Sequence, residues 1–246
     1  MKSLILIIQF LTRIPIPITL DVTEEDFSKG IIFFPFVGFI IGMFTVSFYY
    51  VGYILGGSLL AAVLAVIAEV IITGGLHLDG LGDTFDGIYS NRSRDRILEI
   101  MKDSRLGTNA ALAIFLTLLL KVAAIQVIHT PTIYPILLLM PVFSRFAVVT
   151  ASRFSTYARS SGMGNMFIGK VSRTQFWISL WITVGFSIIY GKTLPYILVV
   201  FICSRLYVKH ITGKIHGMTG DTLGALCELS EIWYLLYILL ISKIWG

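Results

Sequence analysis

Three aspartates at helical spacing are the most chemically suggestive residues of this 246-residue chain. Asp79 is followed four residues later by Asp83 and then three residues later by Asp86. On an α-helix, which turns by roughly 100° per residue, they occupy an arc of roughly 60°. Three carboxylates on one face repel each other unless a cation lies between them, and hard oxygen ligands favour Mg²⁺ or Mn²⁺ bridging a substrate phosphate. The alternative is a solvated acidic helix face.

Glycines surround these aspartates in residues 74–87, which read GGLHLDGLGDTFDG. Glycine lets the backbone approach a ligand closely, but inside a helix it costs stability. The glycines therefore favour a binding site over a solvated face. His77 lies in the same stretch, on a different side of the expected helix from the aspartates. It is either a base or a hydrogen-bonding residue of the loop.

A second amphipathic helix is expected over residues 92–105, because acidic residues recur at every fourth position. Its first residues, 92–96, form a charge run that is typical of a solvated face. Lys102 and Arg105 lie at its end, beside the aspartates. These two are better candidates to bind phosphate, since arginine offers a bidentate fork.

Helices that cross a membrane must position these residues. The chain is 56% hydrophobic and only 13% charged, and a soluble domain carries roughly twice that charge. Several apolar runs approach or exceed the ~18 residues that cross a hydrocarbon core roughly 30 Å thick, where backbone groups must pair within each segment. We therefore predict an all-α, polytopic membrane bundle forming a single domain over 1–246. Its seven expected spans are 30–54, 57–75, 109–128, 132–151, 175–190, 193–208 and 224–244.

The N-terminal segment is expected to be a re-entrant or interfacial helix rather than a span. Arg13, Pro15 and Pro17 interrupt its apolar run after about nine residues, and no cleavage site of a signal peptide follows. Cys203 and Cys227 lie in or beside apolar runs, far from a CxxC spacing, and are expected to be packing residues.

The distribution of basic residues predicts the orientation in the membrane. Alternation of the spans puts four loops on one side, at residues 21–29, 76–108, 152–174 and 209–222. These loops carry most of the basic residues, whereas the opposite side has little besides Lys192 and Lys243. The positive-inside rule assigns the long loops to the cytoplasm. The net charge of +5 then suits anionic lipid headgroups rather than nucleic acid.

Ionisable residues inside the expected spans lie mostly toward the cytoplasmic side. Such residues are costly in a bilayer and usually face a wet cavity or a charged partner. Five of them predict a polar cavity open to the cytoplasm, with snorkelling or structural pairing as the alternatives: Glu69, Arg145, Arg205, Glu228 and Glu231. Lys121 is nearer the opposite interface and is expected to snorkel.

Two further loops carry candidate anion-binding groups. Residues 219–225, TGDTLGA, begin the last span, where Asp221 or Thr222 is a natural N-cap. A helix N-terminus behind glycines is also a ready phosphate site. Residues 157–159, YAR, precede a glycine-containing loop, which makes Arg159 a candidate to bind an anion.

These motifs resemble the cobalamin synthase family, the adenosylcobinamide-GDP ribazoletransferases. The most specific are GGLHLDGLGDTFDG at 74–87 and LEIMKDSRLGT at 98–108. FLTRIPIP at 10–17, YAR at 157–159 and TGDTLGA at 219–225 also match in order and approximate spacing, so the resemblance covers nearly the whole chain. One departure is His216 before Gly217, where family members often have a second glycine.

The resemblance implies a multi-pass enzyme of the cell membrane that assembles the nucleotide loop of cobalamin. It would join adenosylcobinamide-GDP to α-ribazole, or to its 5′-phosphate, with release of GMP and a requirement for Mg²⁺. Phosphoryl transfer of this kind needs a divalent cation, cationic clamps and an oriented hydroxyl. The aspartates would then hold Mg²⁺ on the pyrophosphate. Asp86 or His77 would take the proton from the attacking ribose hydroxyl.

The remaining candidates complete this expected site. The expected metal ligands are Asp79, Asp83, Asp86, Asp103 and Glu228. The expected substrate-binding residues are Lys102, Arg105, Arg145, Arg159 and Asp221. The oligomeric state and the preferred form of α-ribazole stay open.

Two other classes of protein use related features. A CDP-alcohol phosphotransferase that makes lipids also has clustered aspartates and Mg²⁺ at a membrane surface. Its pattern continues into an AR pair and a GxxxDxxxD, which do not follow Asp79-Gly80 here. A cation transporter would place carboxylates near the middle of the bilayer on broken helices in symmetric halves, and no internal symmetry is present.

Overall fold

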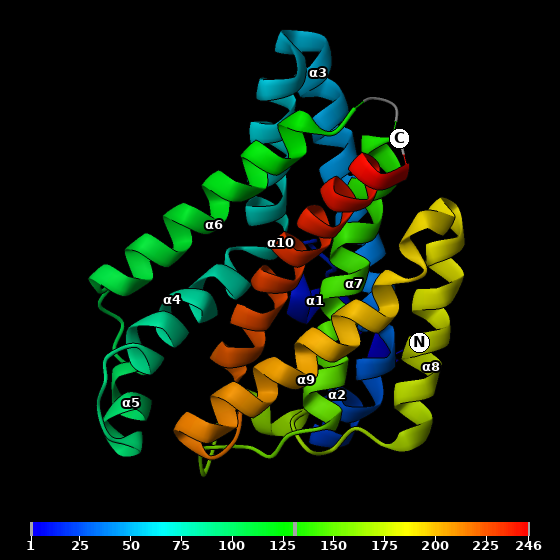
Figure 1. Ribbon diagram of the computed structural model, residues 1–246. Helices are drawn as coiled ribbons and strands as arrows, with labels where there is room; N and C mark the ends of the chain where they lie inside the picture. Colours follow the sequence, from blue (N-terminus) through cyan, green and yellow to red (C-terminus); the bar gives the residue numbers. More distant parts are fainter. Residues whose placement is uncertain (1, 130–131, 246) are drawn as a thin grey trace.

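The computed structural model describes residues 2–129 and 132–245, which fold almost entirely into helices (Figure 1). Within these ranges there is no β-strand, only an isolated bridge between Tyr157 and Met218. The all-α prediction is therefore confirmed. The α-helices are α1 (Lys2–Leu11), α2 (Glu24–Gly30), α3 (Phe34–Thr73), α4 (Leu76–Ile88), α5 (Arg94–Ile100), α6 (Thr108–Val127), α7 (Ile133–Arg153), α8 (Arg173–Ser187), α9 (Tyr196–Ile215) and α10 (Gly220–Trp245). Short 3-10 turns are η1 (Ile31–Phe33), η2 (Met163–Met166) and η3 (Ile188–Thr193).

Helix α3 is a hairpin whose tip stands at the top of Figure 1. Gly56 and Gly57 leave the helical conformation, and Gly57 has φ 75°, which favours glycine. The two arms pack so closely that a Cβ atom on Gly52 would lie 2.7 Å from the Cα of Ala61. The arms correspond to the expected spans 30–54 and 57–75.

Five helices in the described parts of the chain are long and apolar enough to cross a membrane. They are Glu24–Thr73, Thr108–Val127, Ile133–Arg153, Tyr196–Ile215 and Gly220–Lys243. The first of these includes the α3 hairpin, and α8 has only 15 residues. A multi-pass membrane protein is thus confirmed, whereas the count of seven spans is not. Helix α9 also runs on to Ile215, so part of the expected cytoplasmic loop 209–222 is helix.

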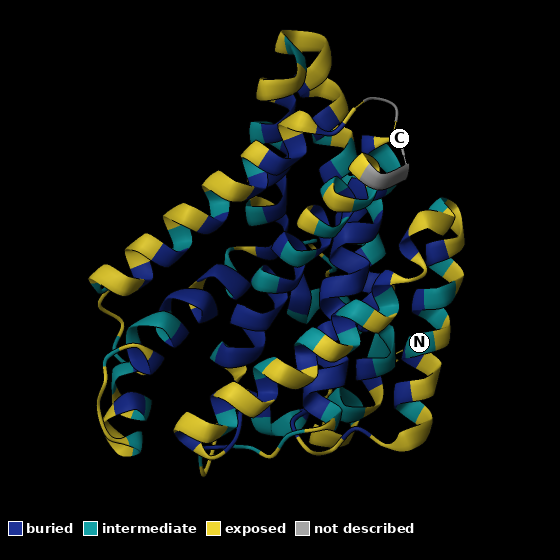
Figure 2. Cartoon of the chain, viewed as in Figure 1, coloured by how far each residue is buried: buried dark blue, intermediate teal, exposed yellow. Residues whose placement is uncertain are grey.

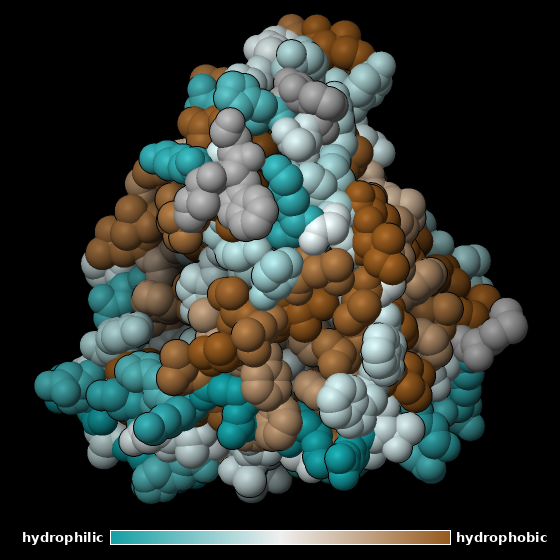
Figure 3. Space-filling view, turned by 45° about the vertical axis from the view of Figure 1, so that its right-hand side comes forward, coloured by the Kyte–Doolittle hydropathy of each residue, from teal (hydrophilic) through white to brown (hydrophobic). Residues whose placement is uncertain are grey.

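The centre of the bundle is α7, which is dark blue along most of its length in Figure 2. It packs against the first arm of α3, where Gly38 and Gly42 lie directly on the backbone of Leu138 and Pro141. Small residues at such crossings let membrane helices approach closely. Helix α6 lies at the edge and exposes leucines and Phe115, as expected of a lipid-facing helix. Figure 3 shows a broad apolar surface across the middle and a largely hydrophilic lower edge.

Helix α1 is short and packs against α2 and α3. Its 10 residues rise by only about 15 Å, which is half the thickness of the hydrocarbon core. Leu6, Ile7 and Leu11 are buried. A helix that does not span the membrane is consistent with the interrupted apolar run in the sequence.

Two glycines form the turn that precedes α4, the helix that carries the aspartates. Gly74 and Gly75 both adopt left-handed conformations, with φ of 64° and 71°, and turn the chain from α3 into α4. Further along α4, a Cβ atom on Gly80 would lie 2.7 Å from the carbonyl oxygen of Asp221. Gly80 therefore permits the close crossing of α4 and α10, rather than the approach of a ligand.

Candidate active site

Helix α4 brings the three aspartates to one cavity. Asp79, Asp83 and Asp86 all line a space of about 290 Å³, whose opposite wall is formed by residues 101–106 and the start of α6. The predicted helical arc is therefore real. Asp79 and Asp83 accept no hydrogen bond and form no ion pair with any residue that the structure describes, so their carboxylates are uncommitted.

Asp86 has a structural partner that the others lack. Its Oδ2 accepts a hydrogen bond from the backbone N–H of Gly107 at 2.7 Å, and its Oδ1 accepts one from Ala110 at 2.9 Å. These donors are orphan groups at the N-terminus of α6, where Gly107 offers no capping side chain. Asp86 thus caps α6 from α4. Both carboxylate oxygens of Asp86 are therefore engaged in the cap, which fits a structural role better than that of a general base.

Among the three aspartates, Asp83 has a clearly raised pKa. Burial, followed by the neighbouring carboxylates of Asp221 and Asp79, raises the pKa of Asp83 to about 7. Nearby negative charges disfavour ionisation of this carboxyl, and a bound cation would offset their repulsion. The repulsion predicted from the sequence is therefore present among these side chains.

A second cavity of about 230 Å³ lies on the other side of Asp79. Its polar lining includes His77, Tyr157, Arg159 and Asp221, and its apolar lining includes Phe10, Phe34 and Phe167. Because Asp79 lines both cavities, groups bound in the two would meet at this carboxylate.

Two distant loops pair to build one wall of this second cavity. Ala158 N–H donates to the carbonyl of Met218 at 2.9 Å, and Met218 N–H donates to that of Thr156 at 2.8 Å. This short parallel pairing places Arg159 Nη2 at 2.9 Å from Asp221 Oδ2. The two motifs that the sequence singled out for anion binding are therefore adjacent, although Arg159 already has Asp221 as an ionic partner.

His77 lines the second cavity but is poorly suited to accept a proton. It is buried, and its Nε2 has no hydrogen-bond partner in the described structure. Burial, with a smaller contribution from nearby Arg145, lowers the pKa of His77 to about 3. A neutral imidazole at ordinary pH fits a hydrogen-bonding role better than that of a general base.

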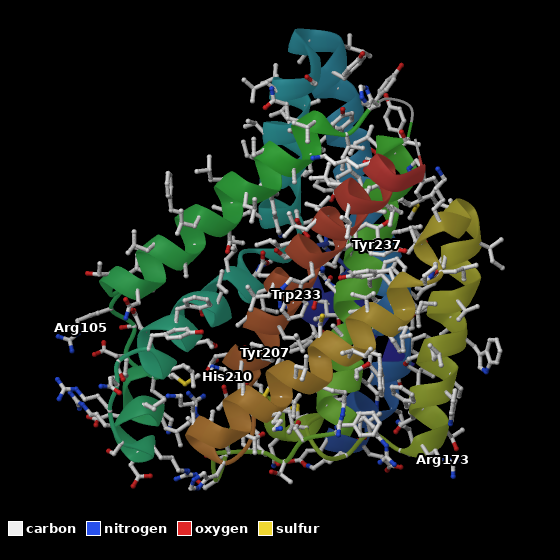
Figure 4. All side chains as sticks on the ribbon, viewed as in Figure 1. Arg105, Arg173, Tyr207, His210, Trp233 and Tyr237 are labelled. Atoms are coloured by element: carbon white, nitrogen blue, oxygen red, sulfur yellow. The ribbon has the colours of Figure 1, made fainter. Side chains whose placement is uncertain are left out.

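Lys102 and Arg105 lie in a loop, not at the end of a helix as expected. Helix α5 ends at Ile100, and in the loop beyond it the Asp103 carboxylate accepts a hydrogen bond from the backbone N–H of Arg105 at 3.1 Å. The Arg105 guanidinium also binds Asp103 and holds the pKa of that carboxyl at about 2. The Arg105 side chain is 87% exposed and points away from the bundle in Figure 4. Both residues line the aspartate cavity, with Asp103 paired to Arg105.

Five ionisable side chains form a closed cluster rather than the expected wet cavity. Lys121 Nζ lies 2.8 Å from Glu228 and 3.2 Å from Glu69, and it also contacts Glu231. Arg145 Nη1 lies 2.5 Å from Glu231. The expectation that Lys121 snorkels is wrong, since its side chain is only 2% exposed. Structural pairing, the alternative considered from the sequence, describes this cluster.

This pairing bears on two expected site residues. Arg145 is 1% exposed and Glu228 5% exposed, and neither lines the aspartate cavity or the cavity beside His77. A metal-binding role for Glu228 and a substrate-binding role for Arg145 are therefore not supported by their positions. Arg205, also expected in the wet cavity, instead lies over the ring of Phe154 at 4.3 Å.

Arg94 is a residue that the sequence did not single out. It lies in the charge run expected to be solvated, yet its Nη2 donates to the carbonyl of Ala158 at 2.7 Å and its Nε to that of Ile215 at 3.1 Å. Arg94 thus ties α5 to the loop that carries Arg159. No sequence signal distinguished it from its neighbours, because its acceptors are backbone groups far along the chain.

The residues expected to bind a metal ion do not form a closed set of ligands. In residues 2–129 and 132–245, no three His, Cys, Asp or Glu side chains are close enough together to hold a metal ion. Mg²⁺ usually keeps several waters and is held by one or two carboxylates plus substrate phosphates. The uncommitted Asp79 and Asp83 carboxylates fit that mode, and a closed cage of side chains is not required.

Comparison with known proteins gives a consistent result over almost the entire chain. Residues 3–239 match the family model described as cobalamin-5-phosphate synthase. The chain is 51% identical over 242 residues to an adenosylcobinamide-GDP ribazoletransferase of Alkaliphilus metalliredigens, which covers 98% of this chain and 96% of that protein. It is 43% identical over 253 residues to the protein of that name from Clostridioides difficile, covering 98% of each.

A third relative, from Clostridium novyi, has the same name and is 46% identical over 244 residues, covering 97% of each chain. No solved structure matches this chain. The residues matched by the family model include α4, the loop after α5 and the start of α10, which line the two cavities. The chain therefore belongs to the cobalamin-5-phosphate synthase family.

Proposed function

We propose that this protein is a transferase of cobalamin biosynthesis that joins adenosylcobinamide-GDP to α-ribazole, or to its 5′-phosphate, and releases GMP. The names of its relatives support this activity. The observation that carries the proposal is the pair of cavities that meet at Asp79. A reaction between two substrates needs two binding places with a shared reacting centre.

The aspartate cavity suits the pyrophosphate of the GDP-bearing substrate. Lys102 and Arg105 line it beside the aspartates, so it offers both cationic groups and carboxylates. Asp79 and Asp83 would hold Mg²⁺, which would neutralise charge on the phosphates during transfer. Asp86 would contribute mainly by fixing α6 against α4. Lys102 and Arg105 would bind phosphate oxygens and the departing GMP.

The second cavity suits α-ribazole, whose base is a planar aromatic system. Phe34, Phe167 and Tyr157 offer aromatic surface there, and aromatic groups pair favourably by stacked or edge-on contacts. Asp221 and Arg159 offer hydrogen-bonding groups to the ribose at the end of the cavity near Asp79. This assignment directs the attacking hydroxyl toward the cavity that would hold the pyrophosphate.

We also propose that both cavities face the cytoplasm of the cell membrane. They are lined in part by the loops after α5 and α7, which carry many of the basic residues and lie far from the α3 tip in Figure 1. An excess of arginine and lysine favours the cytoplasmic side.

The test is an assay of the purified full-length protein in lipid, with adenosylcobinamide-GDP, α-ribazole and Mg²⁺. We expect GMP and a completed corrinoid to form in equal amounts, and no GMP when either substrate is omitted. Chelation of the divalent cation should stop turnover reversibly. Phe167→Leu should raise the KM for α-ribazole and leave the KM for the corrinoid substrate unchanged. Absence of GMP with both substrates present would refute the proposed activity.

A further inference from the structure

A groove on the membrane-facing surface lies apart from both proposed substrate cavities. It has a volume of about 480 Å³ and shares no residue with them. The segment after α1 forms one side, and both arms of the α3 hairpin form the other. Its lining residues are Arg13, Ile14, Pro15, Ile40, Met43, Phe44, Ser47, Ile71 and Ile72.

The walls of this groove have the character of a lipid-facing surface. Met43 is 46% exposed and Ile71 is 54% exposed. They belong to the most apolar of the candidate membrane-spanning segments, with mean hydropathy 2.4. Apolar side chains in this setting contact acyl chains rather than water.

Arg13 supplies the one charge that lines the groove. Its side chain is exposed and forms neither an ion pair nor a side-chain hydrogen bond with residues 2–129 or 132–245. The position is nevertheless fixed, because Arg13 N–H donates to the carbonyl of Ile72 at 2.6 Å and the guanidinium packs on Gly74. An arginine held at the rim of an apolar surface in a membrane calls for an anionic partner.

The direction of the groove matches the direction of a lipid tail. Gly74 ends the second arm of α3, so Arg13 lies at the end of the hairpin away from its tip at Gly56. From Ile40 to Ser47 the groove follows α3 toward the tip, over a helical rise of about 10 Å. A phosphate at Arg13 would therefore leave room for an acyl chain that runs toward the middle of the bilayer.

We propose that this groove binds an anionic phospholipid of the leaflet nearest the two cavities. The lipid phosphate pairs with the Arg13 guanidinium, and one acyl chain lies along Ile40, Met43 and Phe44. The guanidinium packs on Gly74, so the bound lipid stabilises the turn between α3 and α4, the helix that carries the aspartates. The lipid is thus a structural ligand of the active-site helix.

The test measures which lipid stays on the purified full-length protein. The protein is equilibrated in mixed micelles with equal phosphatidylglycerol and phosphatidylcholine of identical acyl chains, and retained lipids are counted by native mass spectrometry. Both headgroups contain a phosphate, but the choline cation neutralises the headgroup of phosphatidylcholine. One arginine therefore predicts about a fivefold preference for the lipid with a net negative headgroup. Arg13→Gln should abolish this preference, whereas Arg173→Gln, an exposed arginine at the edge of the bundle in Figure 4, should keep it.

A second pair of variants tests the groove separately from the charge. Met43→Trp fills the groove and should reduce the retained lipid, while Leu112→Trp on the exposed face of α6 should not. Inorganic phosphate should not displace the lipid, because the acyl chain contributes to binding; displacement would show a site for phosphate alone and overturn the proposal. Equal retention of both lipids by the unaltered protein, or an undiminished preference in the Arg13→Gln variant, would also overturn it.

Discussion

Replacing Lys121 with methionine should destabilise the protein more than any comparable change at its surface. The Lys121 side chain is 2% exposed and contacts Glu69, Glu228 and Glu231. Methionine fills a similar volume but leaves these carboxylates with Arg145 as their only nearby cation in the described structure. Removing one partner of a buried ion pair costs about 3 to 5 kcal/mol, because the remaining charge is left uncompensated.

Arg145 remains beside Glu69 and Glu231, so we expect a loss at the lower end of this range, about 3 kcal/mol in the free energy of unfolding. The assay is reversible unfolding of the purified protein in mixed micelles with increasing SDS, followed by circular dichroism. Lys192→Met is the matched control, because Lys192 is exposed. Adding Glu228→Gln to Lys121→Met should recover part of the loss by removing one carboxylate. A change below about 0.5 kcal/mol for Lys121→Met would refute the reasoning, since that is the range of ordinary surface substitutions.

Three further outcomes follow from single residues. Asp86→Ala removes the cap of α6 and should lower the free energy of unfolding by about 1 to 2 kcal/mol in the same unfolding assay. Asp86→Asn should have an intermediate effect. An unchanged free energy of unfolding for Asp86→Ala would contradict the capping role. If Asp83 is a ligand of Mg²⁺, the cation must displace the proton of this carboxyl, whose pKa is raised to about 7. The Mg²⁺ affinity should then fall by up to about tenfold per pH unit below that pH and level off above it. Calorimetric titration with Mg²⁺ at pH 6 and pH 8 checks this, and equal affinities would exclude Asp83 as a ligand. His216 has a left-handed backbone with φ 59°, so His216→Gly should stabilise the protein by about 0.5 to 1 kcal/mol; a lower melting temperature would show that the His216 side chain has a role of its own.

The last of these predictions also gives a physical reading of a departure noted in the sequence. Family members often have glycine at the position of His216, and the C-cap of α9 requires a left-handed residue there. Glycine adopts this conformation without strain, whereas histidine does so at a cost.

Local periodicity predicted the parts of the site that lie within one element. The spacing of Asp79, Asp83 and Asp86 is a property of a single helix, so their shared cavity could be expected without knowledge of the fold. The helical membrane architecture was equally accessible, because apolar length and low charge dictate it.

The sequence did not predict the roles of residues whose partners lie on other helices. Lys121 was expected to snorkel because its depth was counted along one span, but its three carboxylate partners lie on α3 and α10. The capping role of Asp86 depends on N–H groups about twenty residues further along the chain. The contacts of Arg94 with backbone carbonyls of two distant segments carry no side-chain signature. Sequence periodicity contains no information on such pairings.

GMP release by an Asp83→Asn variant tests the central claim most directly. The comparison uses the unaltered protein and Asp95→Asn, which changes a carboxylate that is 90% exposed on α5. If the carboxylates of α4 hold a cation on the pyrophosphate, Asp83→Asn should lower the rate on the order of 10³-fold while its melting temperature and that of Asp95→Asn stay near the unaltered value. GMP release by a folded Asp83→Asn protein within tenfold of the unaltered rate would contradict the account.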